Sequence, residues 1–235
     1  MGKRKRTPLK KSIRRKRRNV RGRSSLAKAI RRIAYKSMET KSTYYDTATG
    51  PLYDFTTINH NVSQLVFSNM LATYQGTADG TANANRIGDE ITPIGIKFYI
   101  GMKQFADRPN LNWKFWIIKR SGNTVGTSVP VKTITGNLMM DPIDTELVTC
   151  VKIIKHKAPD NYWSGSLATS KEYCTFRSFY LKLPKKPYKY RSDGSDAGKS
   201  YQLSLYVAAY DTTDSLITSN VGKYRVSYQL FFKDG

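Results

Sequence analysis

Residues 94–102, IGIKFYIGM, decide the fold class of this chain. Large apolar side chains at positions 94, 96, 98, 100 and 102 alternate with glycine, lysine and tyrosine at the positions between them. Successive side chains of a β-strand point to opposite faces of its sheet, so a period of two is typical of a strand with one buried face. The sequence therefore predicts a half-buried strand here.

The same alternation recurs along the chain. It is clear over residues 111–117, 179–183, 203–209 and 224–232, and strand-forming residues are also concentrated at 65–71 and 147–155. We expect an eighth strand from either 53–58 or 129–134. Long polar segments separate the strands, and helical periodicity is nearly absent beyond residue 40. The pattern predicts an all-β fold, namely a single eight-stranded jelly-roll β-sandwich with a basic N-terminal arm.

The charge of the chain is concentrated at its start. The formal net charge of the 235 residues is +23, and residues 1–36 hold 17 Lys or Arg and no Asp or Glu. A dense block of like charge repels itself and buries too little apolar surface to fold alone, so it is typical of an interaction arm. We therefore expect residues 1–40 to form the arm and residues 41–235 to form the jelly-roll domain.

The arm is predicted to bind nucleic acid and to act as a nuclear-localisation signal, because clustered lysines and arginines neutralise phosphates. Leu26, Ile30 and Ile33 also predict a short amphipathic helix within it. The alternative is a targeting signal or solvated tail of a protein whose function lies elsewhere. The predicted contacts are Lys3, Arg4, Lys5, Arg6, Lys10, Lys11, Arg14, Arg15, Lys16, Arg17, Arg18, Arg21, Arg23, Lys28, Arg31 and Arg32.

A second basic cluster lies between residues 182 and 191. Cations beside aromatic rings can hold a single strand through phosphate contacts and base stacking. A solvated loop in which two prolines end a strand explains the same residues equally well. The cluster consists of Lys182, Lys185, Lys186, Tyr188, Lys189, Tyr190 and Arg191.

Residues suited to catalysis or metal binding are sparse, and the sequence predicts neither an enzyme nor a cofactor. Only His60 and His156 are available as imidazole bases, and no Walker loop, dinucleotide fingerprint or Cys/His zinc spacing occurs. Asp141, Asp144 and Glu146 could hold an ion between subunits, but they do not match an ordered calcium loop, so no metal site is predicted.

Three stretches together resemble a known family. The acid-free basic arm, the segment NRIGDEI at 85–91 leading into the strand at 94–102, and the last strand ending YQLFFKD at 228–234 look like the capsid proteins of circular Rep-encoding single-stranded DNA viruses, the circoviruses and their relatives. The resemblance implies one eight-stranded jelly roll, assembling as sixty copies into a small icosahedral shell with the arm facing the packaged genome.

The resemblance also implies the partners. These are a single-stranded DNA genome, with RNA left open, further copies of the chain, a host nuclear import receptor, and a host-cell receptor that the sequence does not identify. The protein is then expected in the virion, and in the host nucleus during assembly, with no insertion into a membrane because no apolar run is long enough. The alternative is a monomeric nuclear or ribosomal nucleic-acid-binding protein with a β-domain and a basic tail.

Overall fold

The computed structural model describes residues 26–30, 32–47, 55–73, 86, 88–105, 108, 110–121, 126–157, 173–190, 198–212 and 220–234. The chain divides into two compact units, Met1–Glu39 and Thr40–Gly235. In the first unit, residues 26–30 and 32–37 are helical, and near its end the Ser37 hydroxyl donates a hydrogen bond to the Ala34 carbonyl at 2.7 Å. Within these ranges no helix is long and apolar enough to cross a membrane.

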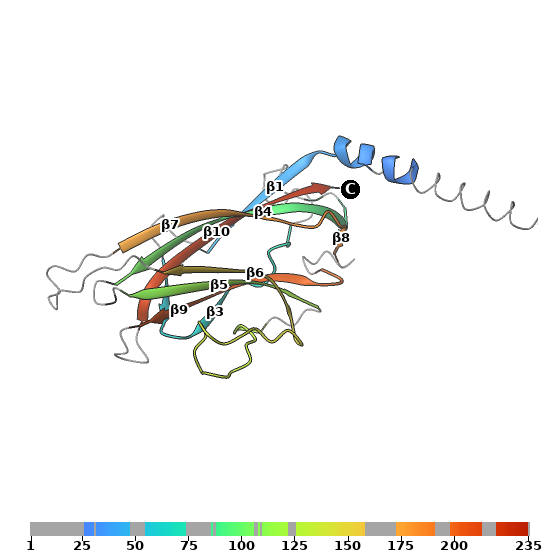
Figure 1. Cartoon of the computed structure of the whole chain (residues 1–235). Coiled ribbons are helices and arrows are strands. Elements are labelled where there is room, and N and C mark those ends of the chain that lie inside the picture. Colours follow the sequence, from blue (N-terminus) through green and yellow to red (C-terminus); the bar gives the residue numbers. More distant parts are fainter. Residues whose placement is uncertain are drawn as a thin grey trace, which may run out of the picture. The chain divides into compact units, whose positions relative to one another are not determined.

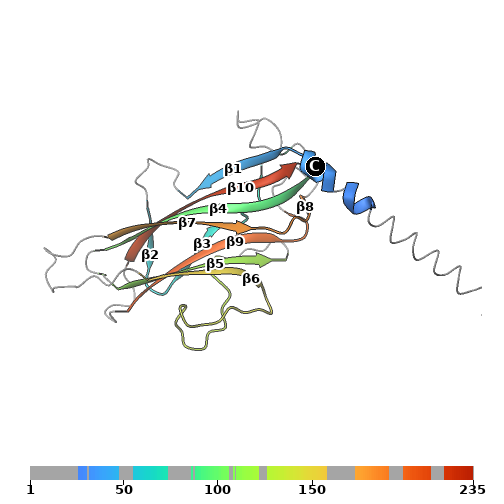
Figure 2. The same ribbon diagram turned by 45° about the horizontal axis from the view of Figure 1, so that its top comes forward.

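The second unit is a sandwich of two antiparallel sheets (Figures 1 and 2). The six-stranded sheet has the order β1 (Thr40–Asp46), β10 (Asn220–Asp234), β4 (Glu90–Gln104) and β7 (Tyr173–Lys182). Two short strands join it, β2 (Thr56–Asn59) beside β10 and β8 (Tyr188–Lys189) beside β4. The four-stranded sheet has the order β3 (Ser63–Phe67), β9 (Gln202–Asp211), β5 (Leu111–Arg120) and β6 (Thr149–Lys157).

The order of the strands identifies the topology. Without the short β2 and β8, eight strands remain. Numbered 1 to 8 in chain order, they form the large sheet in the order 1-8-3-6 and the small sheet in the order 2-7-4-5. The first and last strands therefore pair at one side of the large sheet, and the second and seventh pair in the small one. This arrangement is the double Greek key of a jelly roll, so the predicted fold class is confirmed.

The core between the sheets follows the predicted alternation. Ile96, Phe98, Ile100 and Met102 of β4 are buried and belong to one cluster with the inward side chains of β5, β9 and β10. Ile94 departs from the alternation because it is the extra residue of a bulge in β4: Phe231 of β10 pairs with Gly95, and Phe232 pairs with Pro93. An extra residue in one strand reverses the faces of the residues beyond it.

A second apolar cluster lies on the outer face of the small sheet. Trp116 and Ile118 of β5 and Tyr206 of β9 pack there against Val129 and Val148, which belong to the connection between β5 and β6. This connection, residues 126–148, explains why β5 and β9 are buried on both faces instead of alternating. The candidate strand at 129–134 is therefore wrong: it holds only an isolated bridge from Val131 to Ile143, and its side chains cover a sheet instead of extending one.

The eighth strand of the sandwich is β1, which the alternation did not reveal. Its inward positions are Lys41, Thr43 and Tyr45, only one of which is apolar. Lys41 is accommodated because its ammonium pairs with Asp234 at 3.1 Å. The candidate at 53–58 overlaps the short β2, and β3 ends at Phe67, before the predicted end at residue 71.

Candidate nucleic-acid interface

Most of the predicted arm contacts lie outside the described residues, namely those from Lys3 to Arg23 together with Arg31. Lys28 and Arg32 are described, and both are exposed side chains on the helix of the first unit. Cationic side chains in this state are accessible to a polyanion.

The second basic cluster divides into exposed lysines and buried tyrosines. Lys182, Lys185, Lys186 and Lys189 are exposed, and Arg191 lies outside the described residues. Tyr188 and Tyr190, by contrast, have no exposed surface and belong to the core between the sheets. The prediction that these two rings stack on bases is therefore wrong, because a ring must be accessible to stack on a base.

The hydrogen bonds of Tyr190 explain its burial. Its hydroxyl donates to the Leu71 carbonyl at 2.7 Å and accepts from the Thr73 hydroxyl at 2.8 Å. The guanidinium of Arg86 lies 3.9 Å from the centre of the Tyr190 ring and donates to the Gly88 carbonyl at 2.7 Å. Desolvation raises the pKa of Tyr190, and it raises that of Tyr188 to about 12. Both tyrosines are thus neutral structural residues.

The carboxylates considered for an ion are used within the chain. The backbone N–H and the hydroxyl of Thr135 both donate to Asp141 at 2.8 Å, and the N–H of Ile134 donates at 3.2 Å. These hydrogen bonds, first the one from the Thr135 backbone, lower the pKa of Asp141. Lys132 lies 2.9 Å from Glu146 and 4.0 Å from Asp144. The three carboxylates therefore stabilise the 126–148 connection. The ammonium of Lys132 lies beside Asp144 and Glu146, where a metal cation would be expected to bind.

The outer face of the six-stranded sheet carries both aromatic and basic side chains. We call the side of the six-stranded sheet that faces away from the core the "outer sheet face". The corresponding side of the small sheet is covered by the 126–148 connection. Among the described residues of the outer sheet face the acidic ones are Asp46 and Glu90. Asp46 pairs with Arg225 at 2.6 Å, and Glu90 pairs with Lys189 at 3.4 Å. Other residues of this face include Tyr44, Lys97, Tyr99, Lys103, Phe176, Tyr180, Lys182, Lys223 and Phe231.

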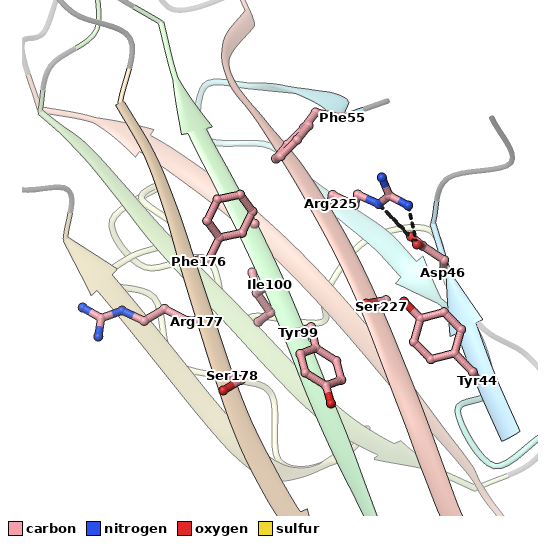
Figure 3. Close-up of a pocket in the computed structure, with 11 residues that line it drawn as sticks. Tyr44, Asp46, Phe55, Tyr99, Ile100, Phe176, Arg177, Ser178, Arg225 and Ser227 are labelled. Carbon is pink, nitrogen blue, oxygen red and sulfur yellow. Dashed lines mark hydrogen bonds and ion pairs between the residues drawn. The ribbon is translucent and has the colours of Figure 1, made fainter. Parts of the chain in front are cut away.

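A pocket of about 610 Å³ opens on this face (Figure 3). Tyr44 of β1 and Tyr99 of β4 line it from either side of Ser227 of β10. Gly101 lies beneath Phe55 and Phe176, since a Cβ there would meet the two rings at 3.0 and 3.2 Å. Arg177 also lines the pocket but points away from these aromatic rings (Figure 3).

The sequence contained a signal for this surface that we did not use. The residues between the buried positions of β4 are Gly95, Lys97, Tyr99, Gly101 and Lys103. A purely solvated strand face carries polar side chains, whereas this one combines an aromatic ring and two glycines with two lysines. Tyr44, Phe55 and Phe176 could not be associated with it beforehand, because they come from segments whose pairing is fixed only by the topology.

Comparisons with known proteins give weak similarities. No family model matches the chain, and no curated protein sequence does. Among solved structures it is similar to the BFDV capsid protein, crystallised as a 60-mer, with 8% identity over 83% of this chain and 90% of that chain and a TM-score of 0.27. It is also similar to VP1 of the Trichodysplasia spinulosa-associated polyomavirus, with 12% identity over 83% of this chain and 79% of that chain and a TM-score of 0.12. Scores this low do not establish a shared fold, so the jelly roll is assigned from the strand order alone.

Proposed function

We propose that this chain is a viral capsid protein that self-assembles into a small icosahedral shell and packages a single-stranded DNA genome through its basic N-terminal arm. One observation carries the proposal: a jelly-roll sandwich follows an acid-free segment that holds 17 Lys or Arg in residues 1–36. The remaining 199 residues hold 23 basic and 17 acidic ones, so the excess charge belongs mainly to the arm. A sandwich that builds a shell and an arm that neutralises a genome need this partition.

The magnitude of the arm charge fits packaging. Sixty copies would bring about 1,020 positive charges into one particle, which matches the phosphates of a genome on the order of a kilobase. Phosphate neutralisation releases condensed counterions, so the binding is sequence-independent and depends steeply on salt. A nuclear-localisation signal alone needs only about 5 to 8 basic residues.

The sequence resemblance supports the finer parts of the proposal. It implies DNA as the genome, sixty copies in the shell, and entry into the host nucleus through an import receptor. The protein then acts as a structural component of the virion and not as an enzyme. The histidine at position 60 is consistent with this role, since its Nδ1 accepts a hydrogen bond from the backbone N–H of Asp211 at 3.2 Å.

Imaging the purified full-length protein tests the proposal. Negative-stain electron microscopy at low salt is expected to show uniform closed particles, and nuclease digestion should leave a protected nucleic acid inside them. Digestion of the extracted material with DNase or RNase identifies the genome type. If only monomers or small oligomers appear under varied salt and pH, the proposal fails and a monomeric nucleic-acid-binding protein becomes the better description.

A further inference from the structure

We propose that the outer sheet face is a second contact for single-stranded nucleic acid, in which Tyr44 and Tyr99 stack on a base while Lys97, Lys103 and Lys223 meet phosphates. This inference rests on the proposed function and adds a defined binding surface to the arm. Single strands are held by aromatic rings and cations together, because every base has a face on which a ring can stack.

The aromatic rings are available for stacking. Tyr44 is 58% exposed, Tyr99 39% and Phe176 74%. Tyr44 and Tyr99 belong to strands on opposite sides of β10, and neighbouring strands are about 4.8 Å apart, so the two backbones are separated by roughly 10 Å. Ser227 lies between them and is small, which leaves space for a planar ring above it.

The charges on this face favour an anion. Its basic side chains include Lys97, Lys103, Lys182, Lys189, Lys223 and Arg225, whereas the two carboxylates among its described residues, Asp46 and Glu90, form ion pairs with Arg225 and Lys189. Lys103 and Lys223 are direct neighbours across the β4–β10 pair. Like charges in such positions destabilise a sheet, and a phosphate between them would remove that repulsion.

The two faces of the sandwich differ in a way that supports the same occupant. The small sheet covers its outer apolar side chains with its own 126–148 connection. The large sheet keeps Tyr44, Tyr99, Phe176 and Tyr180 exposed and mixes them with lysines. A polyanion is complementary in charge to such a basic face.

The first test separates base stacking from charge. Full-length protein is stripped of bound nucleic acid at high salt and titrated with oligodeoxythymidylate and with an abasic oligonucleotide of equal length. The thymidylate is expected to bind about five-fold more tightly or better, since each stacked base adds to affinity. The double variant Tyr44→Ala/Tyr99→Ala should lose this preference and keep its affinity for the abasic strand.

A control variant changes apolar side chains elsewhere that are more exposed than the two tyrosines. Ile134→Ala/Leu147→Ala alters the 126–148 connection, whose side chains at these positions are 72% and 68% exposed, and should retain the preference for bases. Photocrosslinking with an iodouracil-substituted strand should label peptides of β1 and β4. Labels confined to residues 1–36, or equal affinity for both probes, would overturn this inference and leave the arm, and hence the proposed function, intact.

The pair Lys103 and Lys223 gives a second test, in which thermal stability and oligonucleotide binding are expected to respond differently. Lys223→Gln should leave the melting temperature of the free protein unchanged or raise it, because it removes the like-charge contact with Lys103. The same substitution should weaken oligonucleotide binding and reduce the slope of log affinity against log salt by about 0.7. Lys119→Gln removes a charge from the small sheet. It should neither weaken oligonucleotide binding nor reduce the salt slope, and it should not raise the melting temperature. If the aromatic double variant instead reduces particle yield in the absence of nucleic acid, the outer sheet face is a subunit interface and the inference is wrong.

Discussion

At the scale of single residues, Tyr190 shows how an apparent binding residue can be structural. Replacing it with Phe removes the donor to the Leu71 carbonyl and the acceptor for the Thr73 hydroxyl, both in the core. An unmet buried polar group costs about 1–3 kcal/mol, and for a domain of this size each kcal/mol lowers the melting temperature by about 2–4 °C. We therefore expect Tyr190→Phe to melt several degrees lower, by circular dichroism.

Nucleic-acid binding discriminates between the two roles of Tyr190. A phenylalanine ring stacks on a base as a tyrosine ring does, so unchanged affinity would suit either role. Tyr190→Leu removes the ring altogether, and the structure predicts a larger loss of stability with no change in the affinity of the folded protein for oligodeoxythymidylate. A specific loss of affinity at temperatures where the variant is folded would contradict the burial of Tyr190.

Asp141 links the stability of the 126–148 connection to pH. Hydrogen bonds from Thr135 and Ile134 lower the carboxyl pKa in the folded state below its ordinary value of 3.8. A carboxyl group whose pKa is lower in the folded state than in the unfolded state stabilises the fold at pH values above its unfolded-state pKa. This stabilisation disappears as the pH falls through the folded-state pKa. Asp141→Ala should therefore melt at a lower temperature than the native protein at pH 7. The difference is expected to narrow only below about pH 4.

Thermal melts across pH check the Asp141 prediction, with Glu146→Ala as a matched acid-to-alanine control in the same connection. The Glu146 side chain is 80% exposed and pairs only with the half-exposed Lys132, so its loss should have little effect. A difference between Asp141→Ala and the native protein that stays constant into strong acid would contradict the assigned hydrogen bonds.

At the scale of elements, the sequence predicted strands where apolar and polar residues alternate strictly. The strands β4, β5, β9 and β10 fall at the predicted places, because their core-facing apolar side chains recur with a period of two, even in β5 and β9, whose outer face is also buried. The strand β1 was missed because its inward side chains include Lys41 and Thr43, which an ion pair and an edge position allow. An edge strand shows less of the core in its sequence than a central strand does.

The signal for Tyr188 and Tyr190 was present in the sequence but was ambiguous. Tyrosine alternates with lysine at positions 188–190, and the sequence left a stacking surface and a solvated loop as equal explanations. The same alternation is that of the short strand β8 and the residue after it: Tyr188 and Tyr190 are buried, and Lys189 is exposed. Sequence alone could not decide, because both interpretations place a cation beside an aromatic ring; only the pairing of β8 with β4 fixes which face is buried.

Lys114 connects the small sheet to its covering segment. Its ammonium donates to the carbonyls of Leu138 and Met139 at 2.8 and 3.1 Å and lies 4.9 Å from the centre of the Trp116 ring. Lys114→Met keeps the volume of the side chain and removes these hydrogen bonds. We expect faster amide hydrogen exchange over residues 126–148 and unchanged protection in β4 and β10, since the two apolar clusters are separate.

The exchange experiment has a natural comparison in Lys119→Met. Lys119 is exposed near the end of the same strand, and its ammonium lies 4.3 Å from the centre of the Tyr201 ring, whereas the carbonyls of Leu138 and Met139 accept from Lys114. Lys119→Met should leave amide hydrogen exchange over residues 126–148 unchanged. If Lys114→Met instead accelerates exchange throughout the sandwich, the connection is part of one cooperative unit with the core.

At the scale of the whole molecule, fold and charge are distributed separately along the chain. The described part of the sandwich contains several ion pairs, such as Arg225 with Asp46 and Arg108 with Asp211. Residues 1–36 of the arm hold no Asp or Glu. This separation allows the arm to bind a polyanion without disturbing the packing of the sandwich, as a shell protein that encloses a genome requires.

The separation predicts the salt dependence of binding. Each phosphate neutralised on a single strand contributes about 0.7 to the slope of log affinity against log salt. The test variant carries glutamine in place of five arm residues, Arg14, Arg15, Lys16, Arg17 and Arg18. Its slope should be lower by up to about 3.5 if all five contact phosphates. The melting temperature of the sandwich should be unchanged. Titrations of fluorescent oligodeoxythymidylate from low to high salt measure the slope, with Lys132→Gln as a sandwich control that should not change it. An unaltered slope in the five-residue variant would mean that this part of the arm does not contact phosphate, and packaging would then have to depend on the remaining arm residues or on the outer sheet face.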